Sequence, residues 1–113
     1  MEGPVVSGFS GRGFRVDDGV YDGLTLTPTR ADGWSPPPLE ALTADALAPL
    51  FAMDPPPEFI LLGTGATLRR PSPALEAALP CGIEVMDSRA AARAWGVLRA
   101  ELRWIGAALY PLA

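Results

Sequence analysis

The residues with the clearest chemical potential lie in the stretch FILLGTGATLRRPSP, residues 59–73, where a glycine pair follows an apolar run. Gly63 and Gly65 resemble the start of the GxGxxG turn that holds the phosphates of a dinucleotide. The third glycine of that motif would fall at position 68, which is a leucine, and Pro71 and Pro73 delay the helix that should begin at once. We therefore expect the glycines to serve a sharp turn away from a buried strand, with no nucleotide bound there.

Arginines supply the next candidate chemistry. Arg69 and Arg70 follow the glycine turn, where guanidinium groups and backbone amides could bind an anion, although two solvated arginines are the commoner outcome. Further along, Arg93 and Glu101 lie about two turns apart on one predicted helix, and Arg103 begins the strand that follows. These three side chains either line a cationic pocket near the glycine turn or form an ion-pair lattice that fixes the helix to the sheet. We favour the lattice.

Two other ionisable side chains have structural interpretations. Glu84 lies within the apolar segment GIEVM, so we expect it to pair with one of the arginines, because an unpaired buried charge is costly. Cys81, the one cysteine of the chain, precedes this segment and is expected to be a small buried hydrophobe. No spacing of acidic residues indicates a carboxylate pair for acid–base catalysis.

Composition excludes several classes of chemistry. The 113 residues include no His, Lys, Asn or Gln, so all nine positive side chains are arginines. Without His there is no Ser-His-Asp triad, no Cys-His pair and no imidazole metal site. Without Lys there is no Schiff base and no P-loop lysine. We therefore predict no catalytic residues, no bound metal and no cofactor.

The net charge of −4 is distributed unevenly. Residues 1–65 carry three arginines against nine acids, and residues 66–113 carry six against four. The acidic half would repel phosphate, so nucleic acid is not an expected partner, whereas the basic half could form an anion pocket or a protein-docking face.

No signal peptide opens the chain, and no apolar run approaches the ~20 residues that a bilayer needs. We expect a cytoplasmic protein without stable membrane insertion, and the sequence does not indicate its oligomeric state.

The first half of the chain predicts a β-rich opening. Residues 1–12 are glycine-rich and are expected to be loose. Alternating apolar residues over 14–27 predict short strands, with Asp18-Gly19 as a hairpin turn. The tetrapeptide ADGW suggests another turn, and the SPPP run that follows blocks regular structure.

The second half alternates helix and strand. The expected elements are a helix over 39–53, a buried strand over 59–62, a short helix over 73–79, a buried strand over 82–86, a helix over 88–101 and a last strand over 103–111. Thr43, Ser72 and Ser88 are the expected helix caps, and Pro49 should bend the first helix. The order predicts an α/β fold over residues 1–113, a single compact domain with a mixed, partly parallel sheet, flanking helices and an N-terminal β-hairpin portion.

The segments FILLGTG and GIEVMDSRAAARAWGVLRAELRWIGAAL resemble the mitochondrial complex I assembly factor 3 family and its bacterial and archaeal relatives, domain-of-unknown-function family 498. The likeness covers nearly the whole chain. The positions that match the family pattern are Gly63, Gly65, Glu84, Met86, Ala91, Arg93, Leu98, Glu101 and Arg103, with Ser88 in place of the usual threonine. Ala94, Trp95 and Gly96 replace Thr-Tyr-Asn, which keeps an aromatic anchor but removes a hydroxyl and an amide.

The resemblance implies a compact α/β domain with no established enzymatic activity. The mitochondrial members look like chaperone-type factors that help assemble the quinone-binding arm of respiratory complex I. The leading hypothesis is therefore a non-enzymatic module that binds a partner protein or assists assembly of a respiratory membrane complex.

The competing hypothesis is a small-molecule or anion binder, or a cryptic enzyme, with its site near the Gly63–Gly65 loop, where ligands of α/β sheets usually bind. A deep pocket with converging polar groups would favour this alternative, and a flat apolar patch would favour protein binding. The candidate ligand- or partner-binding residues under either hypothesis are Gly63, Gly65, Arg69, Arg70, Arg93, Glu101 and Arg103.

Overall fold

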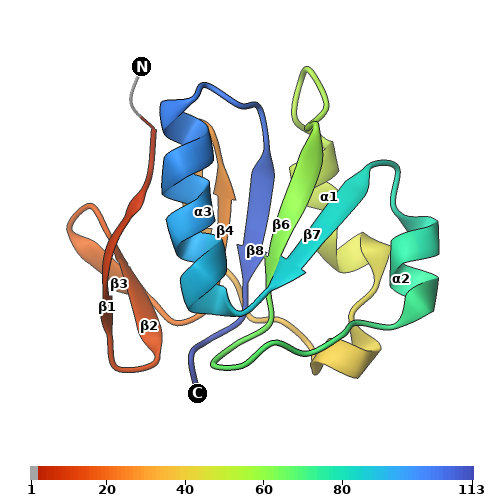
Figure 1. Cartoon of the computed structure of the whole chain (residues 1–113), viewed down its shortest axis with the longest axis horizontal. Coiled ribbons are helices and arrows are strands. Elements are labelled where there is room, and N and C mark those ends of the chain that lie inside the picture. Colours follow the sequence, from red (N-terminus) through yellow and green to blue (C-terminus); the bar gives the residue numbers. More distant parts are fainter. Residues whose placement is uncertain (1–2) are drawn as a thin grey trace.

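Two β-sheets organise the protein in a computed structural model that describes residues 3–113 (Figure 1). Strands β1 (Val6–Ser10), β2 (Gly13–Val16) and β3 (Gly19–Tyr21) form a small antiparallel sheet. The larger sheet has the order β5-β4-β8-β6-β7 and contains β4 (Leu24–Thr27), β5 (Arg30–Gly33), β6 (Phe59–Gly63), β7 (Gly82–Met86) and β8 (Gly106–Leu109). Strand β6 pairs in parallel with β7 and β8, whereas β4 pairs antiparallel with β5 and β8.

The helices cover both faces of the larger sheet. The longest, α3 (Ser88–Ala100), lies on one face beside the small sheet (Figure 1). The other face is covered by α1 (Ala48–Phe51), α2 (Pro73–Ala78) and two 3₁₀ turns, η1 (Leu39–Ala41) and η2 (Ala44–Leu47). The expected α/β domain with a mixed, partly parallel sheet and an N-terminal hairpin portion is thereby confirmed.

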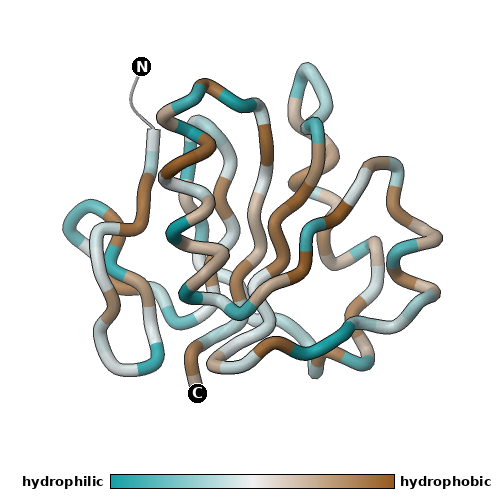
Figure 2. Tube along the Cα trace, in the orientation of Figure 1, coloured by the Kyte–Doolittle hydropathy of each residue, from teal (hydrophilic) through white to brown (hydrophobic). Residues whose placement is uncertain are grey.

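The hydrophobic core consists of two clusters separated by the larger sheet. Leu61 of β6 packs with Trp95 of α3 in one cluster, while Ile60 and Leu62 pack in the other. This alternation follows from the two-residue period of a strand that is covered on both faces. Figure 2 shows apolar residues along β6 and hydrophilic residues on outer loops. Cys81 is partly buried at the edge of the second cluster, and burial raises the pKa of its thiol.

The N-terminal segment is more ordered than expected. Residues 1–12 were expected to be loose, but they contain β1, whose residues pair antiparallel with β2. The indole Nε1 of Trp95 also donates a hydrogen bond to the carbonyl oxygen of Pro4 at 2.8 Å. The prediction is wrong for residues 6–10, because composition does not indicate that a strand and a helix will lie beside them. Residues 1–2 lie outside the described residues.

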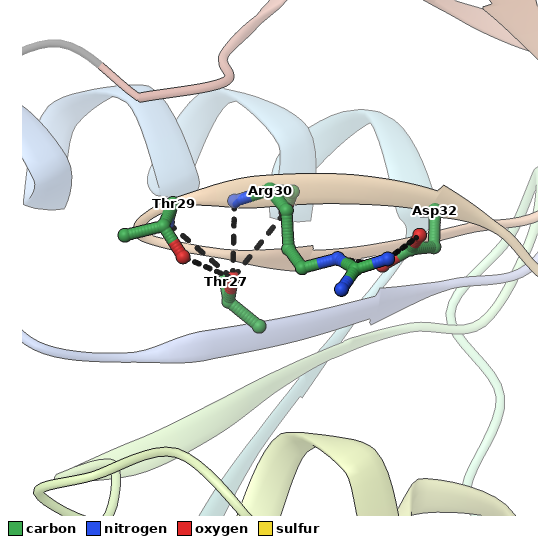
Figure 3. A network of polar contacts seen from close by, with 4 residues as sticks. All are labelled: Thr27, Thr29, Arg30 and Asp32. Carbon is green, nitrogen blue, oxygen red and sulfur yellow. Dashed lines mark hydrogen bonds and ion pairs between the residues drawn. The ribbon is translucent and has the colours of Figure 1, made fainter.

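The turn expected at ADGW is also wrong, since Arg30–Gly33 form strand β5. The chain reverses earlier, at Pro28 and Thr29, and the hydroxyl of Thr27 accepts hydrogen bonds from the amides of Thr29 (3.3 Å) and Arg30 (3.1 Å) (Figure 3). Arg30 then donates to both carboxylate oxygens of Asp32, at 2.9 and 2.8 Å. A short edge strand with an ion pair on it is a poor template for unwanted strand pairing.

The helix expected over residues 39–53 is divided into η1, η2 and α1. Leu42 and Thr43 adopt extended conformations that interrupt it, and Thr43 precedes η2 without a side-chain capping bond. Pro49 lies in the first turn of α1, where no amide is required.

Ser72 caps α2 as expected, accepting a hydrogen bond from the amide of Ala74 at 3.2 Å. The last strand, β8, is shorter than expected.

Candidate functional site

The carboxyl ends of β6, β7 and β8 meet at the N-terminus of α3 (Figure 1). At this edge the Gly63–Gly65 bend follows β6 and lies between the ends of β7 and β8. The amide of Tyr110 donates to the carbonyl oxygen of Gly63 at 2.9 Å, and the amide of Thr64 donates to the carbonyl oxygen of Met86 at 2.9 Å. Ligands of α/β sheets commonly bind at this edge. Whether the bend can bind one depends on whether its polar groups are free or already bonded within the protein.

Ser88 lies at the centre of this edge and is fully buried. Its hydroxyl accepts a hydrogen bond from the amide of Gly65 at 2.8 Å and donates one to the carbonyl oxygen of Tyr110 at 2.7 Å. Its own amide donates to the carbonyl oxygen of Gly65 at 2.8 Å. Ser88 was expected to cap α3, but Asp87 is the cap and accepts a hydrogen bond from the amide of Ala90 at 2.9 Å. The serine hydroxyl instead joins the bend to the end of β8.

Both glycines of the bend are required by its geometry. A Cβ atom on Gly63 would lie 2.8 Å from the Cα of Ser88 and 2.8 Å from the Cδ2 of Leu109. Gly65 has a φ of +105°, which side-chain-bearing residues rarely adopt, and its Cβ would lie 3.2 Å from the carbonyl oxygen of Pro111. The geometric role expected for the pair is therefore supported by the surrounding atoms.

The amides of the bend bond to the protein itself. The buried hydroxyl of Thr64 donates to the carbonyl oxygen of Thr67 at 2.8 Å and accepts from the amide of Arg69 at 3.0 Å. The amides of Thr64, Gly65, Arg69 and Ser88 therefore bond within the protein and are not aimed at a phosphate. The amides of Thr64 and Gly65 and the hydroxyl of Thr64 are thus satisfied by other groups of the protein.

The candidate arginines beside the bend are exposed. A guanidinium nitrogen of Arg69 lies 3.7 Å from a carboxylate oxygen of Glu40, with both side chains more than half exposed. Arg70 forms no ion pair within residues 3–113. These two side chains stand at the same edge as Gly63 and Gly65, and they remain available to solvent.

Arg103 lies at the opposite end of the sheet, beside the start of β6. Its Nε and Nη2 donate to one carboxylate oxygen of Glu58 at 3.0 and 2.7 Å, and the amide of Trp104 donates to the other oxygen at 3.0 Å. The hydrogen bond from Arg103, followed by that from Trp104, lowers the pKa of Glu58. A guanidinium nitrogen of Arg99 donates to the carbonyl oxygen of Arg103 at 2.6 Å. Arg103 thus fastens the segment after α3 to the start of β6.

Arg93 lies within α3, and Glu101 caps the C-terminal end of this helix, two residues before Arg103. Both are exposed on α3 or just past it, and their side chains make no hydrogen bond or ion pair with any residue that the structure describes. Glu101 acts on Arg103 only through space, adding slightly to the rise in the pKa of Arg103 that Glu58 mainly causes. The seven candidate residues therefore separate into three places and do not form one pocket.

Glu84 does not form the ion pair expected for it. Its strand β7 is at the edge of the sheet, so the side chain is exposed, and it has no cationic partner in the described part of the chain. The apolar sequence around it suggested a strand covered on both sides, but an edge position leaves one side open to water.

Sequence reasoning missed an open groove of about 510 Å³ next to the bend. We call it the Trp34 groove, and its walls include Arg12, Asp22, Trp34, Pro36, Pro37, Pro38, Tyr110 and Pro111. The rings of Trp34 and Tyr110 meet edge to face with centroids 5.3 Å apart. The SPPP run predicts only a break in regular structure, and nothing in its local pattern indicates that it lines a groove.

Tyr110 fixes the floor of the Trp34 groove. Its phenol donates a hydrogen bond to the carbonyl oxygen of Pro37 at 2.8 Å. Burial, with a contribution from Glu40 and an opposing one from Arg69, raises the pKa of Tyr110 to about 12. The phenol stays protonated at neutral pH and acts as a structural donor.

Two kinds of feature are absent from residues 3–113. No three His, Cys, Asp or Glu side chains come close enough together to hold a metal ion there. Within the same residues, no helix combines the length and the apolar character that a membrane crossing requires.

Several solved structures share this fold. A Bordetella parapertussis protein is 26% identical with a TM-score of 0.84, and the match covers 98% of both chains. A Bartonella henselae protein described as an outer membrane protein is 26% identical with a TM-score of 0.82, covering 96% of this chain and 95% of that one. A Bordetella pertussis protein described as a Mth938-like domain is 23% identical with a TM-score of 0.80, covering 97% and 87%, and shows the fold alone.

No curated protein matches the chain. Residues 6–110, which span the small sheet, the glycine bend and α3, match the family described as "Protein of unknown function (DUF498/DUF598)". This chain is therefore a member of the DUF498/DUF598 family.

Proposed function

We propose that this protein is a non-catalytic module that binds a partner protein in the Trp34 groove. The observation that carries the proposal is the contrast at the sheet edge. The polar groups of the bend converge on one another, while the groove beside them is open and walled by aromatic and proline rings. A surface of this kind offers flat contacts with aromatic and proline rings beside the polar groups of Arg12, Asp22 and Ser35, which suits a peptide segment better than a small polar substrate.

The walls of the groove favour an extended partner segment. Prolines and the packed rings of Trp34 and Tyr110 lose little conformational freedom on binding, so contacts with them come at a small entropic cost. Grooves lined by aromatic rings hold extended segments, including proline-rich ones, in many recognition domains. At the rim, Arg12 and Asp22 lie 3.5 Å apart and supply one charge of each sign. We therefore propose an extended, mostly apolar segment, which also contacts these rim charges, as the part of the partner that binds.

The cellular role that we propose is assembly, in the cytoplasm, of a respiratory membrane complex. The support is the resemblance of the glycine bend and α3 to the mitochondrial assembly factors. In that role the partner is a complex subunit or a second assembly factor.

Anion binding is a second candidate function, and one observation favours it. Arg69 and Arg70 are exposed at the edge that carries the glycine bend, and Arg70 has no carboxylate partner among residues 3–113. An anion held there would bind the guanidinium groups of these two arginines, without the amide of Arg69, which already bonds to the hydroxyl of Thr64.

A capture experiment in the native cell tests the proposal. Tagged wild-type protein should retain a partner that Trp34→Ala and Arg12→Glu both lose. Arg12→Glu changes only the exposed rim, so it separates loss of binding from loss of folding. Val5→Ala, which removes an exposed apolar side chain outside the groove, is the matched control and should retain the partner. Capture of no partner at low salt, or of one that is retained equally by all variants, contradicts the proposal.

A further inference from the structure

One exposed stripe of α3 has no function in the protein's own fold. Arg93, Val97 and Glu101 follow one another at intervals of one helical turn, so they lie on the same side of the helix. Val97 is 59% exposed, one of the highest values among the large apolar side chains. An exposed valine thus stands between an arginine and a glutamate.

The charges of this stripe lack partners within the described residues. Arg12, Arg30, Arg69 and Arg103 each pair with a carboxylate, whereas Arg93 and Glu101 do not pair with any side chain in the part of the chain that is described. They are too far apart to pair with each other, because two turns of helix span about 11 Å. Each charge is left available to a group outside the domain.

Small residues border the stripe and leave room for a second helix. Ala90, Gly96 and Ala100 flank the line from Arg93 to Glu101. A Cβ atom on Gly96 would meet nothing within 4 Å, so the domain's own packing does not require a glycine there. Because glycine is unfavourable inside a helix, its presence without an internal reason agrees with close approach by another molecule.

We propose that this face of α3 binds a second copy of the chain, with the two helices antiparallel about a two-fold axis at Val97. Positions equally far from Val97 on opposite sides then face each other across the axis. Arg93 of each copy faces Glu101 of the other, and the two Val97 side chains pack together between the two ion pairs. The same stripe forms both halves of the interface.

The charge order along the helix is the reason for choosing a second copy. A positive charge one turn before Val97 and a negative charge one turn after it make the stripe complementary to itself in the antiparallel arrangement. A parallel arrangement would set arginine against arginine. The other arginines near this stripe have contacts of their own. Arg89 lies over the ring of Phe9 at 5.6 Å, Arg99 is bonded to the carbonyl oxygen of Arg103, and Arg103, whose charge acts on Glu101 through space, is bonded to Glu58.

The expected dimer is weak and depends on salt. A single pair of helices about 20 Å long buries less area than a standard stable interface. Exposed ion pairs are screened by added salt, so dissociation should increase with ionic strength. The contact does not involve the Trp34 groove, so Trp34→Ala should leave the dimer unchanged.

Charge reversal tests the pairing directly. We expect wild-type protein to sediment as a dimer at submillimolar concentration and low salt. Arg93→Glu or Glu101→Arg alone should weaken dimerisation by about tenfold or more, because each variant sets like charges together at both ends of the interface. The double variant R93E/E101R should restore the dimer. An equimolar mixture of the two single variants should form heterodimers, because every pair across the axis is then complementary.

Circular dichroism should show unchanged folding in all variants, because both side chains are exposed and have no partner among residues 3–113. Wild-type protein that stays monomeric under these conditions overturns the proposal. A wild-type dimer that neither single reversal weakens, or single variants that fail to associate when mixed, overturns it as well, since the dimer would then use another surface.

Discussion

The two sides of α3 use polar residues in opposite ways. At its buried N-terminus, the hydroxyl of Ser88 and the amides of the glycine bend are all bonded within the chain. On its outer face, Arg93 and Glu101 are exposed without partners among the described residues. A polar group that is bonded and buried holds the fold, whereas one that is exposed and unpaired is free to meet another molecule. The fold and the proposed dimer surface can therefore be perturbed separately.

The largest expected effect on the free energy of unfolding comes from replacing Gly63, in the bend, and Gly96, on the outer face of α3, by alanine. Gly63→Ala should lower the free energy of unfolding by about 2–3 kcal/mol, because the new Cβ would contact the backbone of Ser88 and the bend has little room to move. Gly96→Ala should raise it by about 0.5–1 kcal/mol, since alanine favours the helix and space is free. Urea unfolding at dilute concentration measures both. Shifts of the same sign would show that the two glycines are not used differently.

A smaller loss is expected from Ser88→Ala, which leaves the amide of Gly65 and the carbonyl oxygen of Tyr110 without their buried partner. The free energy of unfolding should fall by about 2 kcal/mol, the usual cost of unsatisfied buried polar groups. Hydrogen exchange at the Gly65 amide should accelerate more than elsewhere. Ser72→Ala is the matched control, because it removes a hydroxyl that caps a short surface helix and should cost only about 0.5–1 kcal/mol. Equal losses for the two serines would contradict a central role for Ser88.

The order of elements could be predicted because strand and helix periods are local properties of the sequence. The run of residues 59–62 reads as a strand, and Ser72 followed by Pro73 reads as a helix start, and both are correct. The Asp-Gly signal at Asp32 failed because an earlier turn, held by the hydroxyl of Thr27, had already reversed the chain. Local signals compete, and the sequence alone does not show which of two adjacent turns forms.

The site could be predicted only where its chemistry is local. The need for glycine at positions 63 and 65 follows from the sharp turn after a buried strand. The roles of Ser88 and Arg103 depend on residues distant in sequence, since Ser88 bonds to Gly65 and Arg103 bonds to Glu58. Glu84 was expected to be buried because the segment around it is apolar. The expectation failed because β7 lies at the edge of the sheet, and the sequence of a single strand does not reveal the strand order.

The smallest expected effect concerns the ion pair between Glu58 and Arg103, which is exposed and therefore screened by water. Because hydrogen bonds from Arg103 and Trp104 lower the pKa of Glu58 below its ordinary value, the folded state is stabilised at higher pH and loses this contribution as pH falls through the lowered pKa. Glu58→Gln should therefore lose less stability than wild type when urea unfolding is measured from neutral pH down to about pH 3. Glu76→Gln removes a carboxylate that has no ion pair among residues 3–113 and should follow the wild-type profile. If Glu58→Gln follows the wild-type profile too, the pair joins the ends of the chain segments without contributing to their stability.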